Sequence, residues 1–228
     1  MISLYTAVGR IERRVDENGQ YPVVMVNNKE HIVDISEMIV WTCCNWRILD
    51  LPGVGKLFRQ LARDAGADES VGFEIYTERL LRRGLIVKGV GDDSAGALYD
   101  LLNSLYIIPV TSGLFVKIAA FLKFTFVNRM PLSRAKIVFR RESLTDEEMR
   151  VVNLARQTQL STAELIKCVE TGVYDLSSES KVMAVLYDDD VTTCDNIGSY
   201  AKLFHQQRHV LETVANLYLR KLIIFERL

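Results

Sequence analysis

Two short stretches decide the fold of the first half of this chain: residues 33–41, VDISEMIVW, and residues 80–87, LLRRGLIV. In the first, polar residues precede an apolar run, which predicts a helix capped at Ser36. In the second, Gly84 separates an amphipathic segment from an apolar run, which predicts the end of a helix and a returning strand. Between them, residues 57–62 are amphipathic with a period of one helical turn, and this indicates a middle helix.

Upstream of these helices the sequence predicts a small antiparallel meander. Residues 2–14 mix apolar and polar side chains, and β-prone runs follow at residues 21–26 and 31–34. Turn residues such as Asn27-Asn28 separate them. The expected order is therefore strands first, then three helices, then the strand at 85–88.

This order resembles the winged-helix superfamily, and in detail the variant with its strands first that is found in PqqD-like proteins and leader-peptide recognition domains. The residues that carry the resemblance are 33–41, 57–62 and 80–87, and it covers about residues 20–90. It implies one of two ligands. One is DNA, with the third helix in the major groove and the wing on the backbone; the other is a peptide that adds as a strand beside the third strand, against the third helix.

The second half restarts with a similar pattern. Thr145 with Glu148 and Ser161 with Glu164 have the spacing of capping boxes, and residues 157–160 form a tight polar turn between the two predicted helices. A long helix over 195–219 and a strand over 222–225 complete it. The predicted fold class is α+β and helix-rich, with two winged-helix-like units, the first of which has an N-terminal antiparallel β-meander. Their predicted boundaries are 1–111 and 112–228.

Composition places the chain among soluble globular proteins. It has 228 residues, of which 49% are hydrophobic and 25% charged, and a net charge of −1. The four cysteines lack the spacing of a metal site or a disulfide framework, which favours a reduced, cytoplasmic protein. The most apolar stretch, residues 105–127, is interrupted by Pro109 and two lysines, so we expect no membrane span.

Divided along the chain, the charges form opposed blocks. Residues 112–142 hold 7 basic and 1 acidic side chains, and residues 143–195 hold 4 basic and 11 acidic ones. The basic block at 117–141 is interleaved with phenylalanines, so it could follow a phosphate backbone. Pairing with the acidic block at 146–195 is the more favoured interpretation, because the opposite charges nearly cancel, and the sequence leaves both open.

Motifs for catalysis are weak throughout. His205 and His209 are one helical turn apart, but the intervening residues lack the glutamate of a zinc protease. The run at 188–190 is three aspartates without the spacing of a calcium loop. Ser94 lacks the glycines of a nucleophile elbow. We therefore expect a non-enzymatic protein without cofactor or metal.

The leading interpretation is a DNA-binding transcriptional regulator, with a possible homodimer. Its expected nucleic-acid contacts are Lys56, Arg59, Arg63, Arg79, Arg82, Arg83 and Lys88. The alternative is peptide recognition by strand addition, which the resemblance places at His31, Val33, Phe73, Tyr76 and Leu80. A third possibility is an interaction protein without a ligand of its own.

Overall fold

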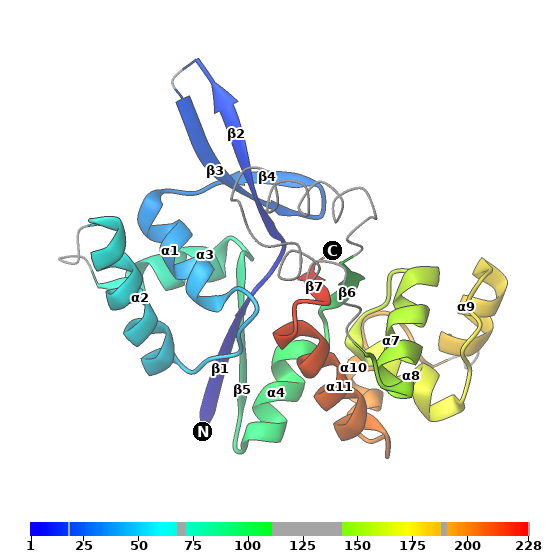
Figure 1. Ribbon diagram of the computed structural model, residues 1–228. Helices are drawn as coiled ribbons and strands as arrows, with labels where there is room; N and C mark the ends of the chain where they lie inside the picture. The colour runs from blue at the N-terminus through cyan, green and yellow to red at the C-terminus, as the bar shows by residue number, and fades with distance from the viewer. Residues whose placement is uncertain (18, 68–71, 111–142, 188–190, 228) are drawn as a thin grey trace.

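The computed structural model describes residues 1–17, 19–67, 72–110, 143–187 and 191–227, and in these ranges the fold is α+β, as predicted. Two units lie side by side, the first to the left and the second to the right in Figure 1. Unit 1 consists of β1 (Ile2–Ala7), β2 (Arg10–Asp16), β3 (Gly19–Val26), β4 (Lys29–Ile32), α1 (Ile35–Cys44), α2 (Leu51–Ala65), α3 (Phe73–Arg82), β5 (Ile86–Gly91) and α4 (Ser94–Leu102). Unit 2 consists of β6 (Tyr106–Pro109), α7 (Asp146–Gln157), α8 (Thr162–Thr171), α9 (Glu179–Leu186), α10 (Ile197–Ala201), α11 (Gln207–Leu219) and β7 (Ile223–Glu226). None of the described helices is long and apolar enough to cross a membrane.

The predicted meander is present as a three-stranded antiparallel sheet in the order β2-β3-β4. Asn27 and Asn28, both with positive φ, form the two-residue turn between β3 and β4. The β2–β3 hairpin projects away from the helices (Figure 1). Both β2 and β4 are therefore edge strands of this sheet.

Two details of the predicted helices are wrong. The N-cap of α1 is Asp34 rather than Ser36, because the Asp34 side chain accepts from the Glu37 N–H while the Glu37 carboxylate accepts from the Asp34 N–H. The predicted helix 195–219 is divided into α10 and α11. At the division, the Gln206 N–H donates to the Glu170 carboxylate of α8 (2.9 Å) instead of continuing a helix.

Each unit is built around a two-stranded antiparallel sheet whose strands come from its two ends. β1 pairs with β5 in unit 1, and β6 pairs with β7 in unit 2. In both units the residue just before the N-cap of the second helix bonds to the first strand: the Tyr5 N–H donates to Leu49 O (2.7 Å), and the Ile107 N–H donates to Leu160 O (3.0 Å). The predicted boundary after residue 111 thus follows β6, which already belongs to the second sheet.

The helix N-caps repeat with the same spacing. Asp34 and Asp50 cap α1 and α2, and Thr145 and Ser161 cap α7 and α8, so sixteen residues separate the two caps in each unit. α2 and α8 both end at a glycine in the left-handed conformation. The first two helices of each unit therefore share the spacing of their N-caps and the glycine end of the second helix.

A buried glutamate and an arginine close the repeated motif in unit 1. Glu37, in the first turn of α1, accepts from Arg83 at the end of α3 (Nη1 to Oε2, 2.8 Å). The other guanidinium nitrogen of Arg83 donates to Ile32 O (2.5 Å), two residues before the N-cap. Gly84 follows with φ of 70° and leads the chain into β5.

Unit 2 repeats this arrangement. Glu148, in the first turn of α7, accepts from Arg220 at the end of α11 (2.6 Å), and the same guanidinium donates to Ser143 O (3.2 Å), again two residues before the N-cap. Lys221 follows with φ of 62°. We call each pair the Glu–Arg latch, because it fixes the end of the third repeated helix to the start of the first.

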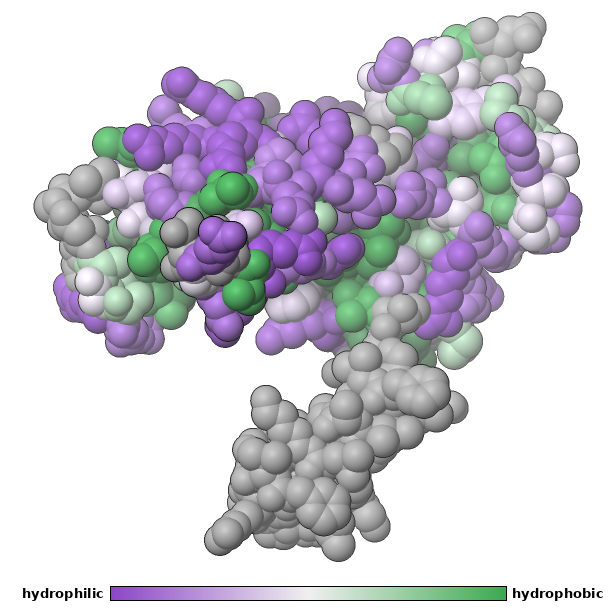
Figure 2. All heavy atoms as spheres, turned by 90° about the horizontal axis from the view of Figure 1, so that it is seen from above, coloured by the Kyte–Doolittle hydropathy of each residue, from purple (hydrophilic) through white to green (hydrophobic). Residues whose placement is uncertain are grey.

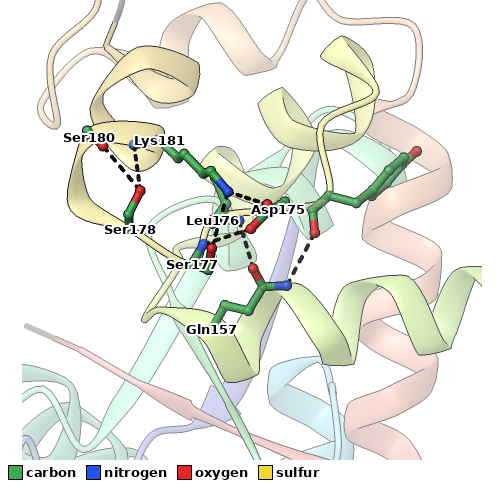
Figure 3. A network of polar contacts seen from close by, with 8 residues as sticks. Gln157, Asp175, Leu176, Ser177, Ser178, Ser180 and Lys181 are labelled. Carbon is green, nitrogen blue, oxygen red and sulfur yellow. Dashed lines mark hydrogen bonds and ion pairs between the residues drawn. The ribbon is translucent and has the colours of Figure 1, made fainter.

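Unit 2 differs in the segment that follows α8. The side-chain amide of Gln157 accepts from the Leu176 N–H (2.7 Å) and donates to Tyr174 O (3.2 Å), and Lys181 pairs with Asp175 (Figure 3). These bonds fix the segment between α8 and α9 against the end of α7.

The units share one apolar core. The buried Tyr218 of α11 links the two units by hydrogen bonds. Its hydroxyl accepts from the Trp46 N–H (2.9 Å) and from the Thr6 hydroxyl (3.0 Å), and it lies 3.3 Å from Cys44 O. The Tyr218 ring stacks on Phe225, with 4.3 Å between centroids. The Tyr218 hydroxyl therefore joins unit 1 to α11 of unit 2.

Candidate functional site

The arginines expected to contact DNA on α3 all have carboxylate partners. Arg83 belongs to the latch, Arg82 faces Glu78 (3.6 Å), and Arg79 faces Asp34 (4.0 Å). A guanidinium already paired with a carboxylate has less to gain from a phosphate. The third helix is thus a weaker DNA-reading surface than the sequence predicted.

The remaining expected cations lie elsewhere. Lys56, Arg59 and Arg63 are exposed at helical spacing along α2 and form one stripe. Lys88 lies on β5, with its Nζ 5.8 Å from the centroid of the Tyr5 ring. The basic block at 117–141 lies outside the described residues.

The residues expected to bind a peptide are divided between core and surface. Val33 and Leu80 are buried in the core and cannot meet a ligand. Phe73 and Tyr76 are half-buried, with ring centroids 6.1 Å and 6.3 Å from that of Phe58. His31 is half-buried in β4, where burial, followed by the charges of Arg83 and Lys29, lowers its pKa.

The outer edge of β4 offers unpaired backbone groups. Val26 and Lys29 flank the two-residue turn and form a hydrogen-bonded pair, so the bonding alternates along β4 and the backbone groups of Glu30 and Ile32 point away from β3. The bond from Arg83 to Ile32 O agrees with this direction. Among the described strands, none pairs with this edge. The N–H and C=O of Glu30 and the N–H of Ile32 remain open to a further strand.

Three isoleucines on the neighbouring elements are exposed: Ile32 in β4 is 64% exposed, Ile35 at the start of α1 61% and Ile75 on α3 50%. Contacts across α3 place them on one surface. Arg83 reaches Ile32 O, Arg79 reaches Asp34, and Ile75 lies one turn before Arg79 on the same helix face. Hydrophobic side chains interrupt the mainly hydrophilic surface of this half of the molecule (Figure 2). We call Ile32, Ile35 and Ile75 the isoleucine patch.

The isoleucine patch was not predicted from the sequence. Each of its members is a large apolar residue and would be assigned to the core by residue type alone. Ile35 is the first residue of α1, and once Asp34 is recognised as the N-cap its outward position follows. The available signal was thus the Asp34–Glu37 capping box.

Unit 2 lacks an apolar patch at the same place. Counting from the N-caps and from the latch arginines, the equivalent residues are Ser143, Asp146 and Glu212. The repeated motif therefore folds with polar residues at all three positions.

Groups suited to catalysis or metal binding are not gathered in the described ranges. No cluster of His, Cys, Asp and Glu in these ranges could hold a metal ion. His205 pairs with Glu170 (3.2 Å) and His209 with Glu147 (2.7 Å), each at the surface. The aspartates at 188–190 lie outside the described residues.

The buried cysteines are unsuited to act as nucleophiles. Burial raises the pKa of Cys43 to about 11 and that of Cys168 to about 12. Cys44 is also buried, and its pKa is raised for the same reason. These thiols stay protonated and therefore unreactive at neutral pH.

A cavity of about 830 Å³ lies between α4 and α10 and is lined largely by carboxylates and glycine backbone. Two of its four aspartates have structural partners: Asp93 accepts from the Gly96 N–H as the N-cap of α4, and Asp100 accepts from the Val90 N–H. Among the described residues that line the cavity, no base is hydrogen-bonded to a nucleophile.

The isoleucine patch and the open edge of β4 are accordingly the features of the described residues best suited to bind a partner. Comparisons with protein-family models, with characterised proteins and with solved structures find no match to this chain.

Proposed function

We propose that this chain is a non-enzymatic, cytoplasmic recognition protein whose first unit binds an extended peptide segment at the outer edge of β4. The observation that carries the proposal is the isoleucine patch beside open backbone groups, at positions where unit 2 has Ser143, Asp146 and Glu212. An exposed apolar group that the fold does not need is typical of an interaction site.

Strand addition explains why the two features lie together. The backbone of Glu30 and Ile32 can bond a partner of any sequence, and the neighbouring isoleucines contact alternate side chains of that partner. Only three backbone groups are open, since Arg83 already bonds Ile32 O. The paired segment is therefore short, and the side-chain contacts must supply much of the affinity.

The test uses a displayed library of random 12-residue peptides selected on the full chain. The matched comparison is a triple variant, Ile32→Ser with Ile35→Asp and Ile75→Glu. It gives unit 1 the residue types that unit 2 has at the three positions of the patch. The control is Leu219→Glu, which removes an exposed apolar side chain from α11 of unit 2. Selected peptides should bind the natural chain and the control and lose at least tenfold in affinity for the triple variant.

Hydrogen exchange of the bound complex tests the geometry. Strand addition protects the amides of Glu30 and Ile32, whose N–H groups otherwise face away from β3. Binding that survives the triple variant, or that leaves both amides unprotected, would overturn the proposal.

DNA binding is the second candidate, and the cationic stripe of α2 is the observation that favours it. Lys56 and Arg59 form no ion pair with any described residue, in contrast to the arginines of α3. A salt-sensitive gel shift that is lost with Lys56→Glu and Arg59→Glu, and kept with Arg82→Glu, would support it. Retention in all variants would eliminate it.

A further inference from the structure

The opposite edge of the meander, β2, is longer than β4 and also open. β2 has seven residues, and within the described part of the chain it pairs only with β3. Val24 and Val26 of β3 direct their backbone groups toward β4, so Tyr21, Val23 and Met25 are the residues of β3 that bond to β2. By alternation, Arg10, Glu12 and Arg14 bond to β3, whereas Ile11, Arg13 and Val15 direct their N–H and C=O groups outward.

The residue opposite Arg13 supports this alternation. It is Pro22, which has no N–H and therefore fits a position that does not bond to β2. The outer edge of β2 thus presents three N–H and three C=O groups in regular order. An edge of this length is a ready template for another strand.

The side chains next to this edge are partly apolar and exposed. Val15 is 71% exposed and Ile11 is 41% exposed, and both lie on the same face of the strand as Arg13. On the other face, Glu12 and Arg14 belong to a network of ion pairs that also includes Arg10 and Glu30.

From the order of these residues we propose that β2 is a dimerisation edge, which pairs antiparallel with β2 of a second copy of this chain about a twofold axis at Arg13. In this register Ile11 lies opposite Val15 of the second copy, and Glu12 lies opposite Arg14 of the second copy. In this register Ile11, Arg13 and Val15 face Val15, Arg13 and Ile11 of the second copy. The three N–H and three C=O groups on the outer edge of each strand therefore all find hydrogen-bond partners.

Twofold axes at Glu12 or Arg14 are electrostatically worse, and axes at Ile11 or Val15 pair only three residues of β2, 10–12 or 14–16, instead of all seven. An axis at Glu12 places Glu12 against its own copy and Arg10 against Arg14, and an axis at Arg14 places Arg14 against its own copy. Directly opposed like charges destabilise a strand pair, whereas opposed unlike charges and apolar pairs stabilise it. The axis at Arg13 has two acid–base pairs and two apolar pairs, against a single like-charge pair at Arg13 itself.

The Arg13 pair gives the proposal a distinctive prediction. Replacing Arg13 by threonine removes the repulsion and keeps a β-forming residue, so the dimer should become about two- to fivefold tighter. Replacing Val15 by lysine puts a charge opposite Ile11 and should weaken the dimer. Sedimentation equilibrium from micromolar to millimolar protein measures both effects.

Cysteine cross-linking tests the register directly, in a Cys194→Ser background that removes the exposed native thiol. Opposed residues of a hydrogen-bonded antiparallel pair have Cα atoms about 5.5 Å apart, which a disulfide can span. Arg13→Cys should therefore oxidise to a covalent dimer. Ile11→Cys alone should not, because four residues along a strand separate its two copies by about 14 Å. A mixture of the Ile11→Cys and Val15→Cys chains should form the mixed dimer.

Two results would overturn the proposal. One is a monomer throughout the concentration range. The other is a dimer in which Ile11→Cys alone cross-links as readily as Arg13→Cys, because such a dimer uses another register or surface. The peptide edge at β4 lies on the far side of the sheet, so failure at β2 leaves the proposed function standing.

Discussion

Units 1 and 2 build one motif with different surfaces. Both place a glutamate in the first turn of the first helix and pair it with an arginine at the end of the third. In both units the residue after that arginine has a positive φ. They differ at the isoleucine patch, where unit 2 is polar. The comparison separates what the motif needs in order to fold from what unit 1 carries in addition.

The largest expected effect is the loss of a latch. Arg83→Ala or Arg220→Ala leaves a buried glutamate without its cation, which should lower the free energy of unfolding by about 2–4 kcal/mol, below the range for fully buried pairs because each arginine is partly exposed. Urea denaturation of the full chain measures it.

Arg82→Ala is the matched control, since its pair with Glu78 is exposed and should change the free energy of unfolding by less than about 0.5 kcal/mol. A large loss in one latch variant and none in the other would show that the two latches are not equivalent.

The next largest effect concerns residue 218, where the two units carry different side chains. Tyr218 corresponds to Leu81 when the latch arginines are matched, and only the tyrosine has a hydroxyl at the boundary between the units. Tyr218→Phe deprives the Trp46 N–H of its acceptor, whereas the Thr6 hydroxyl keeps Arg47 O (2.9 Å), and should lower the free energy of unfolding by about 1–3 kcal/mol. Tyr200→Phe, at an exposed position, should have no measurable effect on thermal unfolding; equal losses would deny that the buried hydroxyl links the units.

Much of this architecture could be predicted from local signals in the sequence. The capping boxes at Thr145 and Ser161 depend on neighbours within four residues, and these predictions are confirmed. The latches could not be predicted, because Glu37 and Arg83 are joined only when α3 packs against α1. The isoleucine patch was missed for the same reason: local pattern cannot distinguish an apolar residue that faces the core from one that faces solvent.

The acid stability of unit 2 should depend on Glu148. Burial raises the pKa of this carboxyl, but the Thr145 N–H and Arg220 outweigh burial, and the folded pKa lies below its ordinary value. The contribution is therefore fully present above the unfolded pKa of about 4.3 and is lost as the pH falls through the folded pKa. Glu148→Gln should reduce the loss of stability below pH 5 in urea titrations at a series of pH values. An unchanged pH profile would contradict this assignment.

The smallest expected effect bears most directly on why the two surfaces differ. Ile35 is the first residue of α1, at the positive end of the helix dipole, where unit 2 has Asp146. A carboxylate stabilises this position and an exposed isoleucine does not, so Ile35→Asp should raise the free energy of unfolding by about 0.3–1 kcal/mol, less at high salt. The reverse change, Asp146→Ile, should lower it by a similar amount. Thermal unfolding at low and high salt measures both changes. If Ile35→Asp stabilises the protein and Asp146→Ile destabilises it, the isoleucine at position 35 is unfavourable to folding, and this supports contact with a partner as the reason for its presence. If Ile35→Asp destabilises the protein, residue 35 serves the packing of unit 1, and the isoleucine patch loses its claim as a binding surface.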